Sequence, residues 1–142
     1  MDLVRLIYAS RMTEDCDIKA IQDILEVART HNKTKDITGV LFYDALQFMQ
    51  CLEGPRQDVN ELYRNILNDR RHQNVQLLEY CEPKGRLFAD WSMGFLAASE
   101  VKREVLEKHL GTGKFDPYKF SADQAVDFLV EMVARNRDSL TS

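Results

Sequence analysis

Residues 48–54, FMQCLEG, carry a polar side chain where the pattern of the stretch calls for an apolar one. Side chains alternate between two faces of a strand, so Gln50 shares a face with Phe48 and Leu52. A buried carboxamide left without hydrogen-bond partners costs about 1–3 kcal/mol. The fold must therefore bring a polar partner to Gln50. The hydroxyl of Tyr8, at the end of the first apolar run, can serve, and a bound planar heteroaromatic ligand can supply the rest.

The length and charge of the chain limit the function classes. The 142 residues suffice for one domain with a core, and no linker rich in Pro, Gly or Ser divides them before about residue 98. A net charge of -4 does not favour a nucleic-acid binder. We expect a soluble protein that binds neither nucleic acid nor membrane, because no basic leader and no run of membrane-spanning length is present.

The cysteines and histidines give no metal or disulfide pattern. Three cysteines at wide spacing predict reduced thiols and a cytoplasmic location. His31, His72 and His109 lack the spacing of metal ligands, so we expect no metal.

The first half of the chain predicts three strands and one helix. Residues 3–9 form a strand with Val4, Leu6 and Tyr8 on one face, and Asp17 caps a helix that runs from Ile18 to His31-Asn32. Residues 40–43 form the second strand, and residues 44–46 turn it into the Gln50 strand as a hairpin. The first and third strands can then be neighbours.

The second half adds a helix and two strands to this unit. A helix follows Pro55 and ends near Asn68-Asp69, with an apolar stripe at Val59, Leu62, Tyr63, Ile66 and Leu67. Strands are expected at residues 75–81 and 91–96. The order βαββαββ puts both helices on one face of a mainly antiparallel sheet, an α+β ferredoxin-like sandwich with an added strand.

Two further helices follow the sheet. One covers residues 100–110. The other begins with a capping box at Ser121 and Gln124 and carries an apolar stripe at Ala125, Val126, Leu129, Met132 and Val133. Ile7, Met49 and Cys51 would be uncovered on the second sheet face, so we expect these helices there or in a subunit interface. The expected organisation is a domain at residues 1–97 and a helical extension at 98–142.

Several of these residues together resemble the BLUF family, sensors of blue light using flavin. The motifs are Leu6-Ile7-Tyr8-Ala9-Ser10, His31-Asn32, Ile37-Thr38-Gly39, Gln50 with Leu52-Glu53-Gly54, Asp69 to His72, and Trp91-Ser92-Met93. They occur in the family's order from Leu3 to about Leu96, and the length with two C-terminal helices resembles the short members without an output enzyme.

The resemblance implies a non-covalently bound flavin between the two helices, FAD ahead of FMN or riboflavin. Tyr8 would donate an electron and a proton, Gln50 would bridge Tyr8 and the flavin, and Asn32 would bond the ring. Trp91 and Met93 would carry the signal, and which of them lies near Gln50 is left open. The implied flavin-binding residues are Tyr8, Ile24, His31, Asn32, Leu41, Phe48, Gln50, Asp69, Arg71 and Met93.

The expected function is a non-enzymatic photoreceptor that works as a hydrogen-bond switch. A carboxamide suits the switch because it has a donor end and an acceptor end that can exchange. The signal would pass to a separate response protein, and we expect a homo-oligomer. Cys51, on the opposite face from Gln50, should not affect the photochemistry.

Two other classes stay open. A flavin-dependent oxidoreductase would need a substrate cavity and acid-base groups. A flavin-free interaction module would let the buried polar groups satisfy one another. Taken singly, Tyr8, Gln50 and Asn32 each have an ordinary structural explanation, and only their coincidence in one order favours the photoreceptor.

Overall fold

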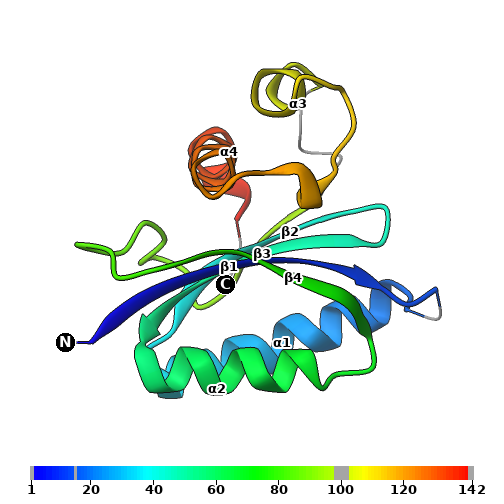
Figure 1. The fold of residues 1–142 in the computed structure, drawn as a ribbon. Helices are drawn as coiled ribbons and strands as arrows, with labels where there is room; N and C mark the ends of the chain where they lie inside the picture. Colours follow the sequence, from blue (N-terminus) through cyan, green and yellow to red (C-terminus); the bar gives the residue numbers. More distant parts are fainter. Residues whose placement is uncertain (1, 15, 98–102, 141–142) are drawn as a thin grey trace.

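A mixed sheet lies between two layers of helices in the computed structural model, which describes residues 2–14, 16–97 and 103–140 (Figure 1). Within these residues the sheet has five strands in the order β4-β1-β3-β2-β5, with β5 parallel to β2 and the other pairs antiparallel. The strands are β1 Leu3–Met12, β2 Thr38–Asp44, β3 Gln47–Pro55, β4 His72–Cys81 and β5 Gly94–Ala97. The helices α1 Ile18–Lys35 and α2 Arg56–Leu67 cover one face. The expected ferredoxin-like α+β fold is confirmed.

The hairpin between β2 and β3 fixes the register of the sheet. Ala45 and Leu46 connect the strands with positive φ values of 49° and 67°, as a two-residue turn with the twist of a hairpin requires. The register pairs Leu41 with Gln50 on one side and Gln50 with Tyr8 on the other. Tyr8, Gln50 and Leu41 therefore form one row across three neighbouring strands.

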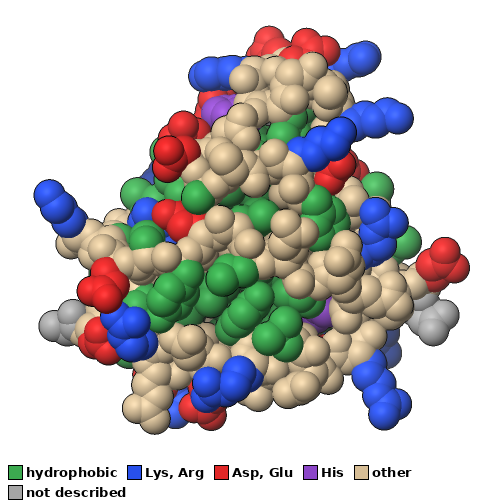
Figure 2. Space-filling model, in the orientation of Figure 1, with side chains coloured by type: hydrophobic (Ala, Val, Ile, Leu, Met, Phe, Trp, Pro, Cys, Tyr) green, Lys and Arg blue, Asp and Glu red, His purple; other side chains and the backbone are tan. Residues whose placement is uncertain are grey.

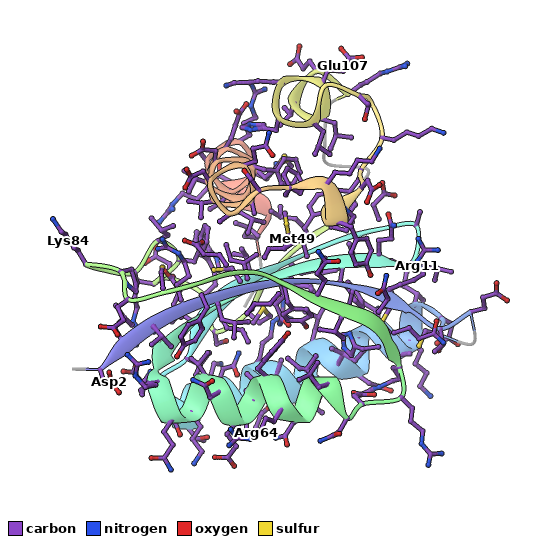
Figure 3. The ribbon with its side chains drawn as sticks, viewed as in Figure 1. Asp2, Arg11, Met49, Arg64, Lys84 and Glu107 are labelled. Atoms are coloured by element: carbon purple, nitrogen blue, oxygen red, sulfur yellow. The ribbon has the colours of Figure 1, made fainter. Side chains whose placement is uncertain are left out.

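Each strand serves two cores, because its side chains alternate between the faces of the sheet. The lower core, on the side of α1 and α2 in Figure 1, contains Val4, Leu6, Tyr8, Ile21, Leu25, Leu41, Phe48, Leu52, Val59 and Met93. The upper core, on the other side, contains Ile7, Val40, Phe42, Met49, Cys51, Phe88, Trp91 and Leu96 with the C-terminal helices. Met49 points into the upper layer in Figure 3. The predicted faces of the first and third strands are confirmed.

The second of the two C-terminal helices covers the second sheet face, as expected, whereas the first packs against that helix. Helix α4 Ala122–Arg135 begins with the predicted capping box and packs Phe128, Leu129 and Met132 on the upper core. Helix α3 Arg103–Leu110 lies on the far side of α4 from the sheet (Figure 1). Glu131 of α4 accepts a hydrogen bond from Lys108 Nζ at 2.9 Å and lies 2.8 Å from His109 Nε2, so it joins the two helices. The expected start of this helix, residues 100–102, lies outside the described residues.

The expected fifth strand at residues 91–96 is wrong at its start, since β5 begins at Gly94. The carbonyl oxygens of residues 91, 92 and 93 accept from Gly39 N at 3.0 Å, Asn32 Nδ2 at 2.7 Å and Arg29 Nε at 3.0 Å. Because these donors take the place of a strand ladder, the segment is irregular. We call these three bonds the carbonyl clamp.

Two smaller differences concern α1. The helix continues to Lys35, beyond the expected end at His31-Asn32, because Asp36 caps it in the left-handed conformation and donates to Asn32 O. The spacing of Ile18, Ile21 and Leu25 predicts that Ile18 belongs to the apolar stripe of this helix, but Ile18 is 75% exposed directly after the N-cap Asp17.

A buried carboxylate fixes the loop that leads from β4 to the clamp. Glu53 of β3 is fully buried and accepts from the backbone N–H groups of Leu87 and Phe88 at 2.9–3.0 Å. Arg5 Nη1 lies 3.6 Å from the carboxylate and supplies a positive charge. Because β3 also carries Gln50, Glu53 fixes the position of the loop relative to the Gln50 strand.

Replacing Glu53 with Ala should lower the free energy of unfolding by about 3–5 kcal/mol, because it leaves two N–H groups without their buried acceptor and removes one of the two carboxylates that face the Arg5 guanidinium. Urea denaturation followed by circular dichroism measures the loss. Glu82→Ala is the matched control: its carboxylate is 70% exposed, and its ion pair with Arg56 should contribute less than about 1 kcal/mol. Equal losses in the two variants would contradict this role of Glu53.

Candidate functional site

Gln50 is held between a phenol and a thioether. The Tyr8 hydroxyl donates to Gln50 Oε1, and Gln50 Nε2 donates to Met93 Sδ at 3.3 Å. Tyr8 is 1% and Gln50 5% exposed. The expected polar partner of Gln50 is therefore present, and each end of the carboxamide has a different neighbour.

A pocket of about 210 Å³ opens between α1 and α2, on the side of the sheet where Tyr8 and Gln50 lie. The helices α1 and α2 contribute most of the lining, three residues come from the segment after α2, and Tyr8 and Gln50 come from β1 and β3. The lining consists of Tyr8, Ile24, Val27, Ala28, His31, Gln50, Leu62, Asn65, Ile66, Asp69, Arg71 and His72. Its volume is below the roughly 300–1,000 Å³ of sites that enclose a whole drug-sized ligand. It suits one planar ring system whose remaining atoms extend toward solvent.

A charged pair borders the pocket. Arg71 Nη2 and Nε donate to the Asp69 carboxylate at 2.7–3.2 Å. These hydrogen bonds hold the pKa of Asp69 below its usual range, so the carboxylate stays ionised and keeps Arg71 in place. The pair can accept and donate hydrogen bonds to the polar part of a ligand.

The end of α1 carries buried polar atoms without partners among the described residues. These are Nδ1 of His31 and Oδ1 of Asn32, and Oγ of Ser92 is a third. Asn32 is fully buried and uses its Nδ2 for the carbonyl clamp. A buried polar atom of this kind costs free energy unless a ligand or water pairs with it. A heteroaromatic ring with an imide N–H could pair with the Asn32 acceptor, so the donor set fits a flavin.

The structure brings together most of the residues that the resemblance implied. Tyr8, Ile24, His31, Gln50, Asp69 and Arg71 line the pocket. Leu41, Phe48 and Met93 lie in the lower core with Tyr8, and Asn32 is buried behind the pocket in the last turns of α1. Trp91 lies apart from them, in the upper core.

The sequence analysis did not assign Val27, Ala28, Leu62, Asn65, Ile66 or His72 to the site. Helical spacing could have found some of them. Ile24, Ala28 and His31 recur on one face of α1, and Leu62, Ile66 and Asp69 follow the same spacing from α2 onward. The apolar face of each helix thus contributes side chains both to the lower core and to the lining of the pocket.

Burial changes the acid-base properties of two groups at the site. Burial is the main reason that the pKa of Tyr8 is raised far above its usual value, with smaller contributions from Tyr63 and Asp69. Burial likewise lowers the pKa of His72, whose Nδ1 lies 2.9 Å from Ser10 Oγ. At neutral pH the site therefore presents a neutral phenol and favours a neutral imidazole.

The fold and the pocket define a ferredoxin-like domain with a cleft for a planar ring. A phenol and a carboxamide, those of Tyr8 and Gln50, line the cleft. The family model of BLUF, described as sensors of blue light using FAD, matches residues 3–94. The chain belongs to this family of flavin-binding blue-light sensors.

Named relatives agree with the match. The blue light- and temperature-regulated antirepressor BluF of Escherichia coli is 33% identical over 118 residues, which is 80% of this chain and 29% of that protein. The photoactivated adenylate cyclase subunit beta of Euglena gracilis is 32% identical over 94 residues, 65% of this chain and 11% of that protein. The chain thus spans less than a third of either relative.

Solved structures of similar size share the fold. The photo-activated state of BlsA superposes with a TM-score of 0.83 at 31% identity, covering 92% of this chain and 94% of that chain. The dark state of BlrB, a BLUF protein, superposes with a TM-score of 0.76 at 31% identity, covering 94% and 96%. The likeness therefore includes much of the C-terminal helical part.

The described residues contain neither a membrane-spanning helix nor a cluster of metal ligands. No helix in the described ranges is both long enough and apolar enough to span a bilayer. Residues 2–14, 16–97 and 103–140 also contain no cluster of three His, Cys, Asp or Glu side chains arranged to hold a metal ion.

The raised pKa of Tyr8 predicts an alkaline loss of stability. In the unfolded chain a tyrosine ionises with a pKa of about 10, whereas the folded protein keeps Tyr8 protonated above that pH. Its contribution to stability is complete below about pH 10 and declines as the pH rises further. Tyr8→Phe should therefore flatten the pH dependence of the free energy of unfolding above pH 10, measured by urea denaturation.

A Tyr8→Phe protein with the parent's slope would show that Tyr8 ionises normally.

Proposed function

We propose that the chain is a non-enzymatic photoreceptor in which Tyr8, Gln50 and a flavin in the pocket form a light-driven hydrogen-bond switch. The position of Gln50 carries this proposal. Its carboxamide is buried between the Tyr8 hydroxyl and Met93 and also lines the pocket. One group can therefore respond to the ring and transmit the change to residue 93.

When bound, the flavin supplies absorption of blue light and an excited state able to take an electron and a proton from a nearby phenol. Tyr8 is protonated and its hydroxyl points at Gln50 Oε1, so the phenol proton would leave along that bond as the electron passes to the flavin, and both would return to Tyr8 after the exchange, without net reduction. Gln50 then exchanges its donor and acceptor ends by rotation or tautomerism. The exchange alters its bond to Met93 and directs a new donor at the ring, which should shift the absorption to the red.

We assign the remaining roles from position. Asn32 and His31 would bond the polar edge of the ring, and Asp69 with Arg71 would bond the polar chain attached to it. Ile24 would pack on the ring from α1, and Leu41 and Phe48 from the sheet side. FAD is the proposed flavin ahead of FMN or riboflavin, as the family description supports.

Tyr8→Phe and Gln50→Leu should each retain flavin and lose the red shift, because each removes one member of the hydrogen-bond chain while keeping an apolar side chain of similar size. Absorption spectra of the purified variants in the dark, after a blue pulse and after return to darkness measure the effect.

Cys51→Ala is the matched control. Cys51 is adjacent to Gln50 but buried in the upper core, so this variant should shift as the parent does. A normal red shift in Tyr8→Phe or Gln50→Leu would contradict the mechanism. A colourless parent, or one that bleaches and needs oxygen to recover, would contradict the proposed function.

The signal would leave through residues 98–142, which we propose as an extension distinct from the sensor domain at residues 1–97. BlsA, of which the chain covers 94%, supports a photoreceptor of this size. A separate protein would then read the light state by binding one state more tightly than the other. The net charge of -4 favours a protein partner over nucleic acid, and the three free cysteines favour the cytoplasm.

We further propose a homodimer formed through β4, the edge strand of the sheet. Figure 2 shows hydrophobic side chains gathered on this side of the molecule, where Leu77 is 46% and Tyr80 38% exposed. An antiparallel pairing of β4 with a second copy, centred between Gln76 and Leu77, would bring the exposed Leu77 of each copy close to the two-fold axis. Apolar contact at the centre supports this pairing.

Leu77→Lys should dissociate the dimer, because it places two like charges near the two-fold axis. Sedimentation velocity measures the change. Leu87→Lys is the control, since Leu87 is 43% exposed in the loop after β4. A parent that sediments as a monomer at every concentration would exclude the dimer.

A further inference from the structure

Trp91 and Met93 lie on opposite faces of the sheet although one residue separates them. Met93 is buried in the lower core against Gln50, and Trp91 is 7% exposed in the upper core. The carbonyl clamp holds the carbonyls of residues 91, 92 and 93. The segment therefore connects the two cores through a backbone that is hydrogen-bonded at each residue. Movement of residue 93 must therefore disturb Trp91 or break these bonds.

The C-terminal 3-10 turn η3 Arg137–Ser139 contacts this segment from above. The guanidinium carbon of Arg137 lies 4.8 Å from the centroid of the Trp91 ring, in a cation–π contact, and Arg137 also forms an ion pair with Asp90. The Leu140 side chain lies within 3.2 Å of the place where a Cβ on Gly94 would be. Residues 137–140 thus lie against residues 90–94, the segment that carries both Trp91 and Met93.

We propose that Arg137 is a positioning residue that holds Trp91 in the upper core and links the state of Gln50 to the C-terminal end of α4. A planar guanidinium stacks on an indole better than an ammonium does, so the contact depends on Arg. The inference rests on the proposed photoreceptor function. If the light state moves Met93, the clamp transmits the movement to Trp91, and the Arg137 contact weakens. By the same coupling, removing Arg137 must change the balance between the two positions of the segment.

Arg135, two residues earlier, offers a matched comparison. It bonds Glu131 at 2.9 Å and lies 3.5 Å from Glu104, so its contacts join α4 to itself and to α3. Arg135 and Arg137 are about half exposed, at 45% and 58%. Replacing either arginine removes one exposed charge, but only the Arg137 contact reaches Trp91.

Fluorescence gives a direct test, because Trp91 is the one tryptophan in the sequence. In the dark, Arg137→Ala should raise the acrylamide quenching constant of Trp91, whereas Arg135→Ala and Asp90→Asn should match the parent. Arg137→Lys keeps the charge but loses the planar stack, and it should behave like the alanine variant. Circular dichroism melts of all variants check that each is folded.

The second readout is the dark recovery of the flavin spectrum. Arg137→Ala should keep the full red shift, because Tyr8 and Gln50 are untouched. It should slow recovery about two- to fivefold, the factor that corresponds to an exposed cation–π contact. Arg135→Ala should recover at the parent rate.

The outcomes separate the two proposals. A parent without a red shift defeats the proposed function, while the quenching comparison still tests the Arg137–Trp91 contact. A parent that shifts normally, with an Arg137→Ala variant that recovers at the parent rate or faster, defeats the coupling even if quenching rises. Unchanged quenching in Arg137→Ala defeats the positioning role itself.

Discussion

The hydrogen bonding of the Gln50 carboxamide is the interaction on which the rest of the structure depends. A buried amide needs a donor at one end and an acceptor at the other, and here Tyr8 and Met93 occupy those positions. Tyr8 reaches Gln50 because the hairpin turn at Ala45 and Leu46 sets the register of β3 between its neighbours. Met93 reaches it because the Glu53 carboxylate and the carbonyl clamp fix the loop and the segment before β5.

The same strands serve both the pocket and the upper core. Alternation along β3 sends Gln50 toward α1 and α2 and sends Met49 and Cys51 toward α4. A change on the lower face has no route through the tightly paired central strands without breaking their ladder. The irregular residues 91–93 at the edge provide one, since the carbonyl clamp and not a strand ladder holds their carbonyls, and they contribute one side chain to each core.

Local patterns predicted the strands, both sheet-covering helices, the capping box of α4 and the need for a partner at Gln50, because each follows from spacing along a short stretch. The start of β5 could not be predicted in this way. It depends on Asn32 and Arg29, which lie about 60 residues away in sequence and take carbonyls that a strand would use. The pocket residues Val27 and Leu62 were missed because an apolar helix face does not reveal whether protein or ligand will cover it.

The carbonyl clamp also has a kinetic consequence. Its three bonds come from a backbone amide of β2 and from a carboxamide and a guanidinium that lie about one turn apart on α1, and the peptide planes that they hold are consecutive. One of these peptide planes cannot rotate without straining the next. A partial displacement would therefore leave a buried donor without its acceptor, and no new contact would replace the lost bond. The segment should therefore exchange between two discrete positions, and the return from one to the other should follow a single exponential rather than a graded relaxation.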